Sequence, residues 1–165
     1  MKTVIVDIDG VCFDPTERLA RCSDGLRMDW QRLFSNEEVA TDKPIPLAAK
    51  RTRKIACKFD IMYLTGRAQS CYTATHNSFV MHEFGGYSSS KLFMRASPDH
   101  RSGHLVKQEY IICQRNNGVE FVAAIDDDWS GMLKTMYESL GIPHFYNFEQ
   151  FFASEVWNNA IQKVD

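Results

Sequence analysis

The sequence has 165 residues, of which 44% are hydrophobic and 24% charged, and its formal net charge is −2 at pH 7. This length accommodates one domain with a sizeable core, and the charge argues against a strongly basic nucleic-acid-binding protein while leaving room for a local basic patch. No apolar run approaches the roughly 18 residues of a membrane span, and the N-terminus lacks the apolar stretch of a signal peptide, so we expect a cytoplasmic protein without membrane contact.

The first strand leads directly into acidic residues. Residues 4–6 form a short β-branched apolar run, which predicts a strand buried on both faces. Asp7, Asp9 and Gly10 follow it, and two carboxylates at this spacing repel each other unless a cation or hydrogen-bond donors lie between them. Because ligands bind at the carboxyl ends of parallel strands, we interpret this stretch as a metal-assisted active site, with an acidic turn after an edge strand as the alternative.

The rest of the chain alternates between strands and helices. The polar segment 11–45 contains several proline and glycine residues and is predicted to be a small cap inserted after the first strand. Further strands are expected at 59–64, 91–94, 120–125 and 144–146, and helices at 46–58, 68–84, 104–115, 132–140 and 148–164. This alternation predicts a parallel sheet in a single Rossmann-like α/β domain over residues 1–165, a three-layer sandwich with a small cap.

The helix predicted at 46–58 is strongly basic. We interpret it as a solvated basic face, and a landing site for a phosphate backbone is the alternative. The basic residues are Lys50, Arg51, Arg53, Lys54 and Lys58.

Three predicted strands end in polar groups that suit a phosphate site, and one helix adds a lysine. These groups are Asp7 and Asp9, Thr65-Gly66-Arg67, Asp126-Asp127-Asp128, and Lys107. Acids on two strands can hold Mg²⁺, while a hydroxyl, a glycine amide and a lysine can bind phosphate oxygens. One carboxylate can attack phosphorus, and its neighbour two residues on can transfer the protons.

Four motifs follow the predicted strands in order: Asp7-Ile-Asp9-Gly10, Leu64-Thr65-Gly66, Lys107 and Ile125-Asp126-Asp127. In these motifs the chain resembles the haloacid dehalogenase (HAD) phosphatase superfamily. The resemblance implies that Asp7 is the nucleophile and Asp9 the general acid and base. It also implies that Thr65 binds the phosphoryl group and that Lys107 stabilises its charge.

The cofactor implied by this resemblance is Mg²⁺, bound by Asp7, by the carbonyl of Asp9, and by Asp126 or Asp127. The chain is then expected to be a phosphomonoester hydrolase that acts through an aspartyl-phosphate intermediate. A catalytically silent phosphate-binding module is the alternative from another functional class.

A narrower resemblance lies in the segment from Leu92 to Glu109, which is similar to the phosphatase domain of bacteriophage polynucleotide kinase-phosphatase. Arg95 lies twelve residues before Lys107, and Arg67 fits a hydroxyl-x-Arg motif. The resemblance implies that Gly66, Arg67 and Arg95 bind substrate. The arginine that this family carries in its cap is not assigned among Arg18, Arg21 and Arg27.

The expected substrate is a 3′-phosphate at a nucleic-acid end, and a 5′(3′)-deoxyribonucleotidase acting on free nucleotides is the alternative. No GxxxxGK[ST] phosphate loop occurs in the sequence, so a kinase or ligase partner is expected to be separate. A phage-encoded protein of this kind would work in the host cytoplasm.

Several residues near the site have simpler interpretations. We expect Arg67 and Arg95 to contact phosphate or substrate backbone rather than surface acids, and Asp128 to cap a helix. Core or cap positions, rather than base stacking, are expected for three aromatic residues, Phe13, Trp30 and Trp129. The five histidines lack metal-ligand spacing and are expected in loops or on the surface.

The cysteines are odd in number, and none forms a CxxC pair. We therefore expect reduced thiols, not a disulfide framework or a zinc site. Cys12 lies near the predicted site, but a carboxylate already fills the role of nucleophile, so Cys12 is interpreted as a spectator.

Overall fold

A computed structural model describes residues 1–162 of the chain. Its centre is a five-stranded sheet in the order β5-β4-β1-β6-β7, in which every strand pairs in parallel with its neighbours. The strands are β1 (Thr3–Val6), β4 (Asp60–Ala68), β5 (Leu92–Arg95), β6 (Phe121–Ile125) and β7 (His144–Phe145). The predicted parallel α/β fold is confirmed.

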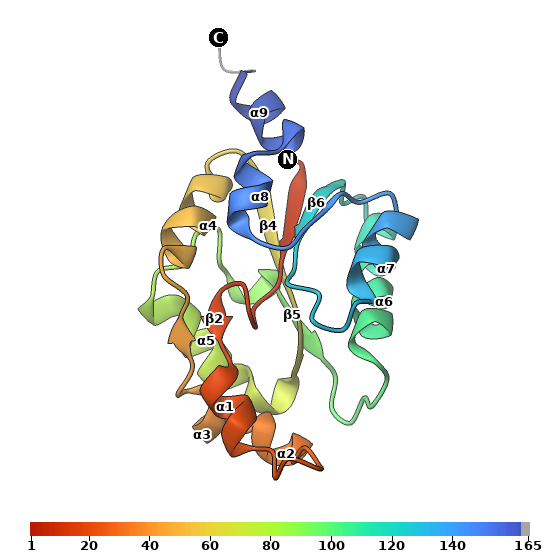
Figure 1. The fold of residues 1–165 in the computed structure, drawn as a ribbon. Helices are drawn as coiled ribbons and strands as arrows, with labels where there is room; N and C mark the ends of the chain where they lie inside the picture. The colour runs from red at the N-terminus through yellow and green to blue at the C-terminus, as the bar shows by residue number, and fades with distance from the viewer. Residues whose placement is uncertain (163–165) are drawn as a thin grey trace.

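Helices cover both faces of the sheet (Figure 1). They are α4 (Ala48–Ala56), α5 (Tyr72–Met81), α6 (Gly103–Asn116), α7 (Leu133–Ser139), α8 (Phe148–Phe152) and α9 (Glu155–Gln162). Side chains alternate along a strand, so Val4 and Val6 join one apolar cluster with α4, α5, α8 and α9. Ile5 joins a second cluster with α6 and α7. Both clusters bury β1, which holds the first acidic motif at the centre of the sheet.

Two element boundaries differ from the sequence-based expectation. Strand β4 continues to Ala68 instead of ending at Leu64, because its pairing with β5 resumes at Ala68 and Arg95 after an irregularity. The predicted helix 68–84 is a 3₁₀ turn, η1 (Gln69–Cys71), followed by α5. Thr65, Gly66 and Arg67 therefore belong to a strand and not to a loop.

The single helix expected at 148–164 is wrong, because the chain forms α8 and α9 with a break between them. Ser154 lies at this break, where its hydroxyl accepts a hydrogen bond from the backbone N–H of Trp157 and so caps α9. Positions 163 and 164 of that expectation lie outside the described residues.

Residues 11–45, which the sequence predicts to form a cap, contain short helices at the lower end of Figure 1 and two short strands. They are β2 (Phe13–Asp14), α1 (Thr16–Arg21), α2 (Trp30–Leu33), α3 (Asn36–Val39) and β3 (Lys43–Pro44). The two strands form an antiparallel ribbon. Asn36 attaches the cap to the main body, because its side chain accepts a hydrogen bond from Ala74 and donates one to the carbonyl of Ser70.

A further 3₁₀ turn, η2 (Ser89–Lys91), precedes β5. Within residues 1–162, the structure contains no helix whose length and apolar character would suffice for crossing a membrane.

Candidate active site

The site begins where β1 ends. Val6 pairs with Tyr63 of β4 and with Ile125 of β6, so Asp7, Thr65 and Asp126 emerge at the same carboxyl edge of the sheet. Asp7 is buried, with 6% of its surface exposed.

Gly10 closes the turn after Asp7, and its position tolerates no side chain. Its φ of 78° lies in the left-handed region, and a Cβ atom there would lie 1.9 Å from Oδ2 of Asp127. The glycine therefore allows the acidic turn after β1 to lie directly against the acidic end of β6.

Lys107 enters the site from α6, whose inward face also buries Val106 and Ile111. Its ammonium lies 2.9 Å from Oδ1 of Asp7 and 2.6 Å from Oδ2 of Asp126. Burial alone would lower the pKa of Lys107, but Asp126 and Asp7 outweigh it, so the pKa is raised. Lys107 therefore stays charged between the two carboxylates.

Three carboxylates surround this one ammonium. Asp7, Asp126 and Asp127 each offer an oxygen, and these oxygens lie within 4.8 Å of one another. Burial, then repulsion from Asp126, raises the pKa of Asp7 well above its usual range and that of Asp127 to about 6. Crowding of three carboxylates around one ammonium therefore disfavours ionisation of all three unless a further cation is bound.

The same carboxylates fit a hard divalent cation. Asp7 Oδ1 and Asp127 Oδ1 are buried, and no donor among residues 1–162 reaches either with hydrogen-bond geometry. The contact of Lys107 with Asp7 Oδ1 is an ion pair at an unfavourable angle for a hydrogen bond. Buried carboxylate oxygens without donors are the ligands that Mg²⁺ prefers, so the residues present fit this ion.

Asp9 belongs to a second, separate ion cluster. Its Oδ1 accepts hydrogen bonds from Arg67 Nη2 at 2.6 Å and from Arg18 Nη2 at 2.7 Å. The same two arginines also bind Asp42, at 2.7 Å from Arg67 and 3.0 Å from Arg18. Two arginines and two carboxylates thus balance their charges where the cap meets the main body.

The ion pairs decide the charge of Asp9. Burial alone would raise its pKa, but Arg67 and then Arg18 outweigh burial, so the pKa is lowered. Burial raises the pKa of Asp42 despite the same two arginines. Because both arginines lie within hydrogen-bond distance of Asp42 and cannot lose their protons near neutral pH, we assign Asp42 as ionised there.

A family model described as the polynucleotide kinase PNKP phosphatase domain matches residues 1–145. The chain belongs to this family. The match confirms the resemblance inferred from the ordered motifs, and it identifies the chain as a phosphatase domain of the HAD type. A search of curated proteins found no match.

Solved structures share the fold at low sequence identity. A chain of the Pnkp1/Rnl/Hen1 complex has a TM-score of 0.66 and 20% identity, and the match covers 88% of the present chain and 46% of that one. The haloacid dehalogenase-like hydrolase SP0104 from Streptococcus pneumoniae has a TM-score of 0.61 and 10% identity, over 87% of this chain and 83% of that one. A class C acid phosphatase from Bacillus anthracis with tungstate bound has a TM-score of 0.57 and 13% identity, over 99% and 73% of the two chains. The present chain thus spans less than half of the Pnkp1 structure's chain.

The residues predicted to bind substrate occupy different environments in this phosphatase domain. Arg67 is 1% exposed and holds Asp9 and Asp42, so its predicted phosphate contact requires an exchange of partners. Arg95 is half-buried and donates hydrogen bonds to the carbonyls of Gly66, Asp99 and Arg101. Arg95 thereby fixes the loop that follows β5 against β4, and its contact with substrate stays a prediction.

Thr65 is buried within β4, two residues beyond the last pair of β1 and β4. Its hydroxyl accepts a hydrogen bond from the backbone N–H of Arg67. Cys12 is also buried, and its thiol donates a hydrogen bond to the carbonyl of Asp7. Burial, then Asp7, raises the pKa of Cys12, which keeps the thiol neutral and supports its interpretation as a spectator. All five cysteines are free.

Two residues of the site, Asp42 and Tyr137, were not singled out from the sequence, and Arg18 was one of three candidates for the cap arginine. Arg18 is the cap arginine that reaches Asp9, and Asp42 completes its cluster. Tyr137 donates to Asp126 Oδ2 at 2.9 Å, and the ring of His144 stacks on it. No local pattern marks Asp42 or Tyr137, because an acid near a turn and an apolar-facing tyrosine are both common.

Three simpler interpretations have different outcomes. Asp128 accepts hydrogen bonds from the N–H groups of Leu133 and Lys134, which confirms that it caps α7. Phe13 lies in the core as expected, whereas Trp129 is 84% exposed, so the expectation of a packed ring is wrong for it. The expectation of a surface or loop position is also wrong for His144, which lies on β7 and contacts the Asp126 carbonyl.

Proposed function

We propose that residues 1–165 form one phosphatase domain that removes the 3′-phosphate from a nucleic-acid end, with Mg²⁺ as cofactor and an aspartyl-phosphate on Asp7. The observation that supports this proposal is the cluster of Asp7, Lys107, Asp126 and Asp127, in which Oδ1 of Asp7 and Oδ1 of Asp127 are buried and accept no hydrogen bond from residues 1–162. A free carboxylate oxygen beside an ammonium suits attack on an anionic phosphorus centre.

In the first step, a carboxylate oxygen of Asp7 forms a bond to phosphorus as the bond to the substrate oxygen breaks. Lys107 stabilises the charge on the phosphoryl oxygens, and the hydroxyl of Thr65 binds one of them. Asp9 gives its proton to the departing oxygen, which requires that the anionic substrate offset the positive charge of Arg67 and Arg18. A bound Mg²⁺ would be held by Asp7, the Asp9 carbonyl, and Asp126 or Asp127, and would neutralise phosphoryl charge.

In the second step, water attacks the phosphorus of the aspartyl-phosphate and Asp9 accepts its proton. The ionised Asp9 seen beside the two arginines is the form that this step needs. The bond between Asp7 and phosphorus breaks, and inorganic phosphate leaves with Asp7 restored.

The polynucleotide substrate is supported by the family match and by two features of the rim. Arg95 ends β5 within the segment that resembles the phage phosphatase domain, and Trp129 follows the acidic end of β6 with its ring in solvent. An exposed indole beside a phosphate site can stack on a nucleobase of any sequence. We further propose that a kinase or ligase partner acts on the same ends, as the Rnl-containing complex of the structural neighbours suggests. The free thiols are consistent with a cytoplasmic site of action.

A free-nucleotide phosphatase of the 5′(3′)-deoxyribonucleotidase kind is the second candidate. The observation that favours it is the contact of Arg18 with Asp9, because it brings the cap close over the site. A closely covered site admits a mononucleotide more readily than a polymer end.

The test measures phosphate release in Mg²⁺ from a 3′-phosphorylated oligonucleotide, the same oligonucleotide with a 5′-phosphate, and 3′- and 5′-deoxynucleoside monophosphates. Asp7→Asn serves as the inactive control. Preference for the 3′-phosphorylated oligonucleotide, weakened by Arg95→Ala, supports the proposal. Preference for mononucleotides overturns it in favour of the second candidate, and no release from any substrate overturns both.

A further inference from the structure

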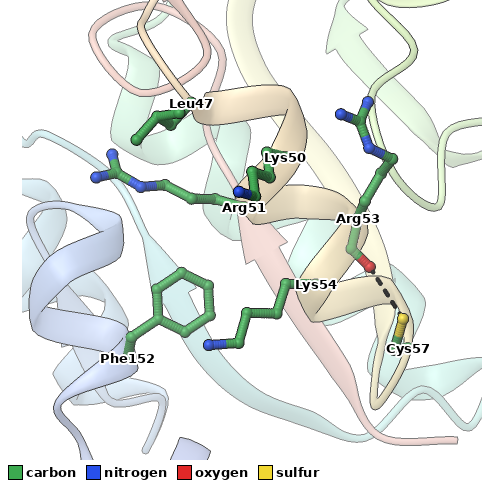
Figure 2. A pocket seen from close by; sticks show the side chains of 7 residues that line it. All are labelled: Leu47, Lys50, Arg51, Arg53, Lys54, Cys57 and Phe152. Carbon is green, nitrogen blue, oxygen red and sulfur yellow. Dashed lines mark hydrogen bonds between the residues drawn. The ribbon is translucent and has the colours of Figure 1, made fainter.

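A shallow groove lies between α4 and α8, outside the catalytic cluster (Figure 2). It has a volume of about 470 Å³, and its walls are Leu47 and the outward side of α4 on one side and Phe152 of α8 on the other. We call it the α4 groove. Its lining is mostly apolar carbon from aliphatic stems and one aromatic ring, with charged groups at the rim.

The rim of the α4 groove is positively charged. Residues 48–58 include no acidic residue, although the whole chain carries a net charge of −2. Arg51 is paired with Glu149. Within the part of the chain that the structure describes, no carboxylate forms an ion pair with Lys50, Arg53 or Lys54, and these three residues are exposed. The groove therefore presents cations that the protein itself does not neutralise.

Two of these cations are held in place by neutral partners. Lys54 lies over the rings of Phe152 and Trp157, with its Nζ at 4.8 and 5.1 Å from the ring centres. Arg53 donates to the carbonyl of Glu83 at 2.7 Å. Neither contact removes the positive charge, and both reduce the side-chain entropy that binding an anion would otherwise cost.

The groove starts near the catalytic edge of the sheet and leads away from it. The backbone N–H of Ile45, just before the groove, donates to the carbonyl of Cys12 in the active-site loop. From there α4 runs antiparallel to β4 towards the end of the molecule where α8 and α9 lie (Figure 1). Its nine residues span about 13 Å, a length that can lie along the backbone of a few nucleotides of one strand.

We propose that the α4 groove binds the sugar-phosphate backbone of a nucleic-acid strand whose terminal phosphate enters the active site. The inference rests on the proposed function and adds a contact several nucleotides from the reacting end. Lys50, Arg53 and Lys54 contact phosphates, while Phe152 and the aliphatic stems contact sugars or bases. This combination of cations with an aromatic floor is characteristic of sequence-independent strand binding. It explains why one helix concentrates basic residues in a chain that is otherwise slightly acidic.

The experiment uses the full chain and a double variant, Lys50→Gln with Lys54→Gln. Binding of an unphosphorylated 12-nucleotide single strand is measured by fluorescence anisotropy at several salt concentrations. Loss of two phosphate contacts should lower the slope of log affinity against log salt by about 1.4, and should weaken binding about 25-fold at 0.1 M salt. Lys134→Gln is the matched control, because Lys134 is an exposed lysine on the opposite helical layer, and it should change neither quantity.

Kinetics separate this inference from the proposed function. With a 12-nucleotide 3′-phosphorylated strand as substrate, the double variant should have a higher KM than the parent protein and the same kcat. With a 3′-phosphorylated dinucleotide, which is too short to reach the groove, both constants should equal those of the parent protein. Circular dichroism and thermal unfolding confirm that the variant folds like the parent protein.

If the long strand is hydrolysed but its KM is unaffected by the double variant, the α4 groove inference is overturned and the proposed function stands. If only mononucleotides are hydrolysed and the 12-nucleotide strand does not bind, both are overturned. Salt-dependent binding of polyglutamate without binding of the oligonucleotide would assign the groove to an acidic protein and would also overturn the inference.

Discussion

Replacing Lys107 with methionine isolates the electrostatic role of this lysine in its cluster with Asp7, Asp126 and Asp127. Methionine keeps an apolar side chain of similar length on α6 but removes the ammonium that lies 2.9 Å from Asp7 and 2.6 Å from Asp126. The side chains of all three residues are at most 8% exposed, so water cannot replace the lost contacts without a change in structure. In Mg²⁺-free protein, the variant leaves buried carboxylates with no cation.

The expected loss is large. Removing one partner of a buried ion pair costs about 3–5 kcal/mol, because the remaining charge stays desolvated. For a chain of this length, each kcal/mol lowers the melting temperature by roughly 2–4 °C, so the variant should melt roughly 6–20 °C lower. Mg²⁺ should recover much of this loss, because the added cation neutralises the same oxygens.

The assay is urea unfolding at pH 8, first in EDTA and again in Mg²⁺. Lys134→Met is the matched control, because Lys134 is 49% exposed and its contact with Glu138 contributes at most about 0.5 kcal/mol. A free energy of unfolding for Lys107→Met within about 1 kcal/mol of the parent value in EDTA would refute the reasoning. It would mean that the carboxylates are hydrated or protonated rather than desolvated and charged.

Four further outcomes test the site. Mg²⁺ at 100 times its Kd should raise the free energy of unfolding by about 2.7 kcal/mol, and Asp127→Asn should remove most of this gain in a thermal-shift assay; equal melting in Mg²⁺ and EDTA would contradict the metal site. Asp7→Asn should lower turnover roughly 10⁴-fold or more. It should not lower the free energy of unfolding in EDTA, because burial disfavours the charged form of the Asp7 carboxyl and raises its pKa; a large loss of stability would contradict this. Gly10→Ala should weaken the rise in melting temperature caused by Mg²⁺, because its Cβ would meet Asp127. Gly25→Ala, which has a similar φ and no neighbour within 4 Å, should cost only backbone strain of about 1 kcal/mol. If both variants reduce the Mg²⁺-induced rise in melting temperature equally, this explanation is wrong. Cys12→Ala should keep turnover within about twofold, and a loss above tenfold would restore the thiol as a candidate participant.

Local patterns in the sequence determined the strand order along the chain and the residues at the end of each strand. A buried apolar run followed by Asp7, Asp9 and Gly10 depends only on neighbours in sequence, as does the alternation of strands and helices. Parallel pairing then brings the ends of β1, β4 and β6 to one edge, so Asp7, Lys107 and Asp126 lie together as the order of motifs suggests.

The tertiary structure alone decided which charged residues pair. Arg18 and Asp42 are 24 residues apart, and Arg67 and Asp9 are 58 apart, so no periodicity of helix or strand relates them. The extension of β4 through Arg67 also depends on a neighbouring strand and not on its own residues. Ion pairing in a buried site depends on distances and desolvation in the folded chain. The sequence therefore predicted a phosphate contact for Arg67, whereas in the folded chain Arg67 pairs with Asp9.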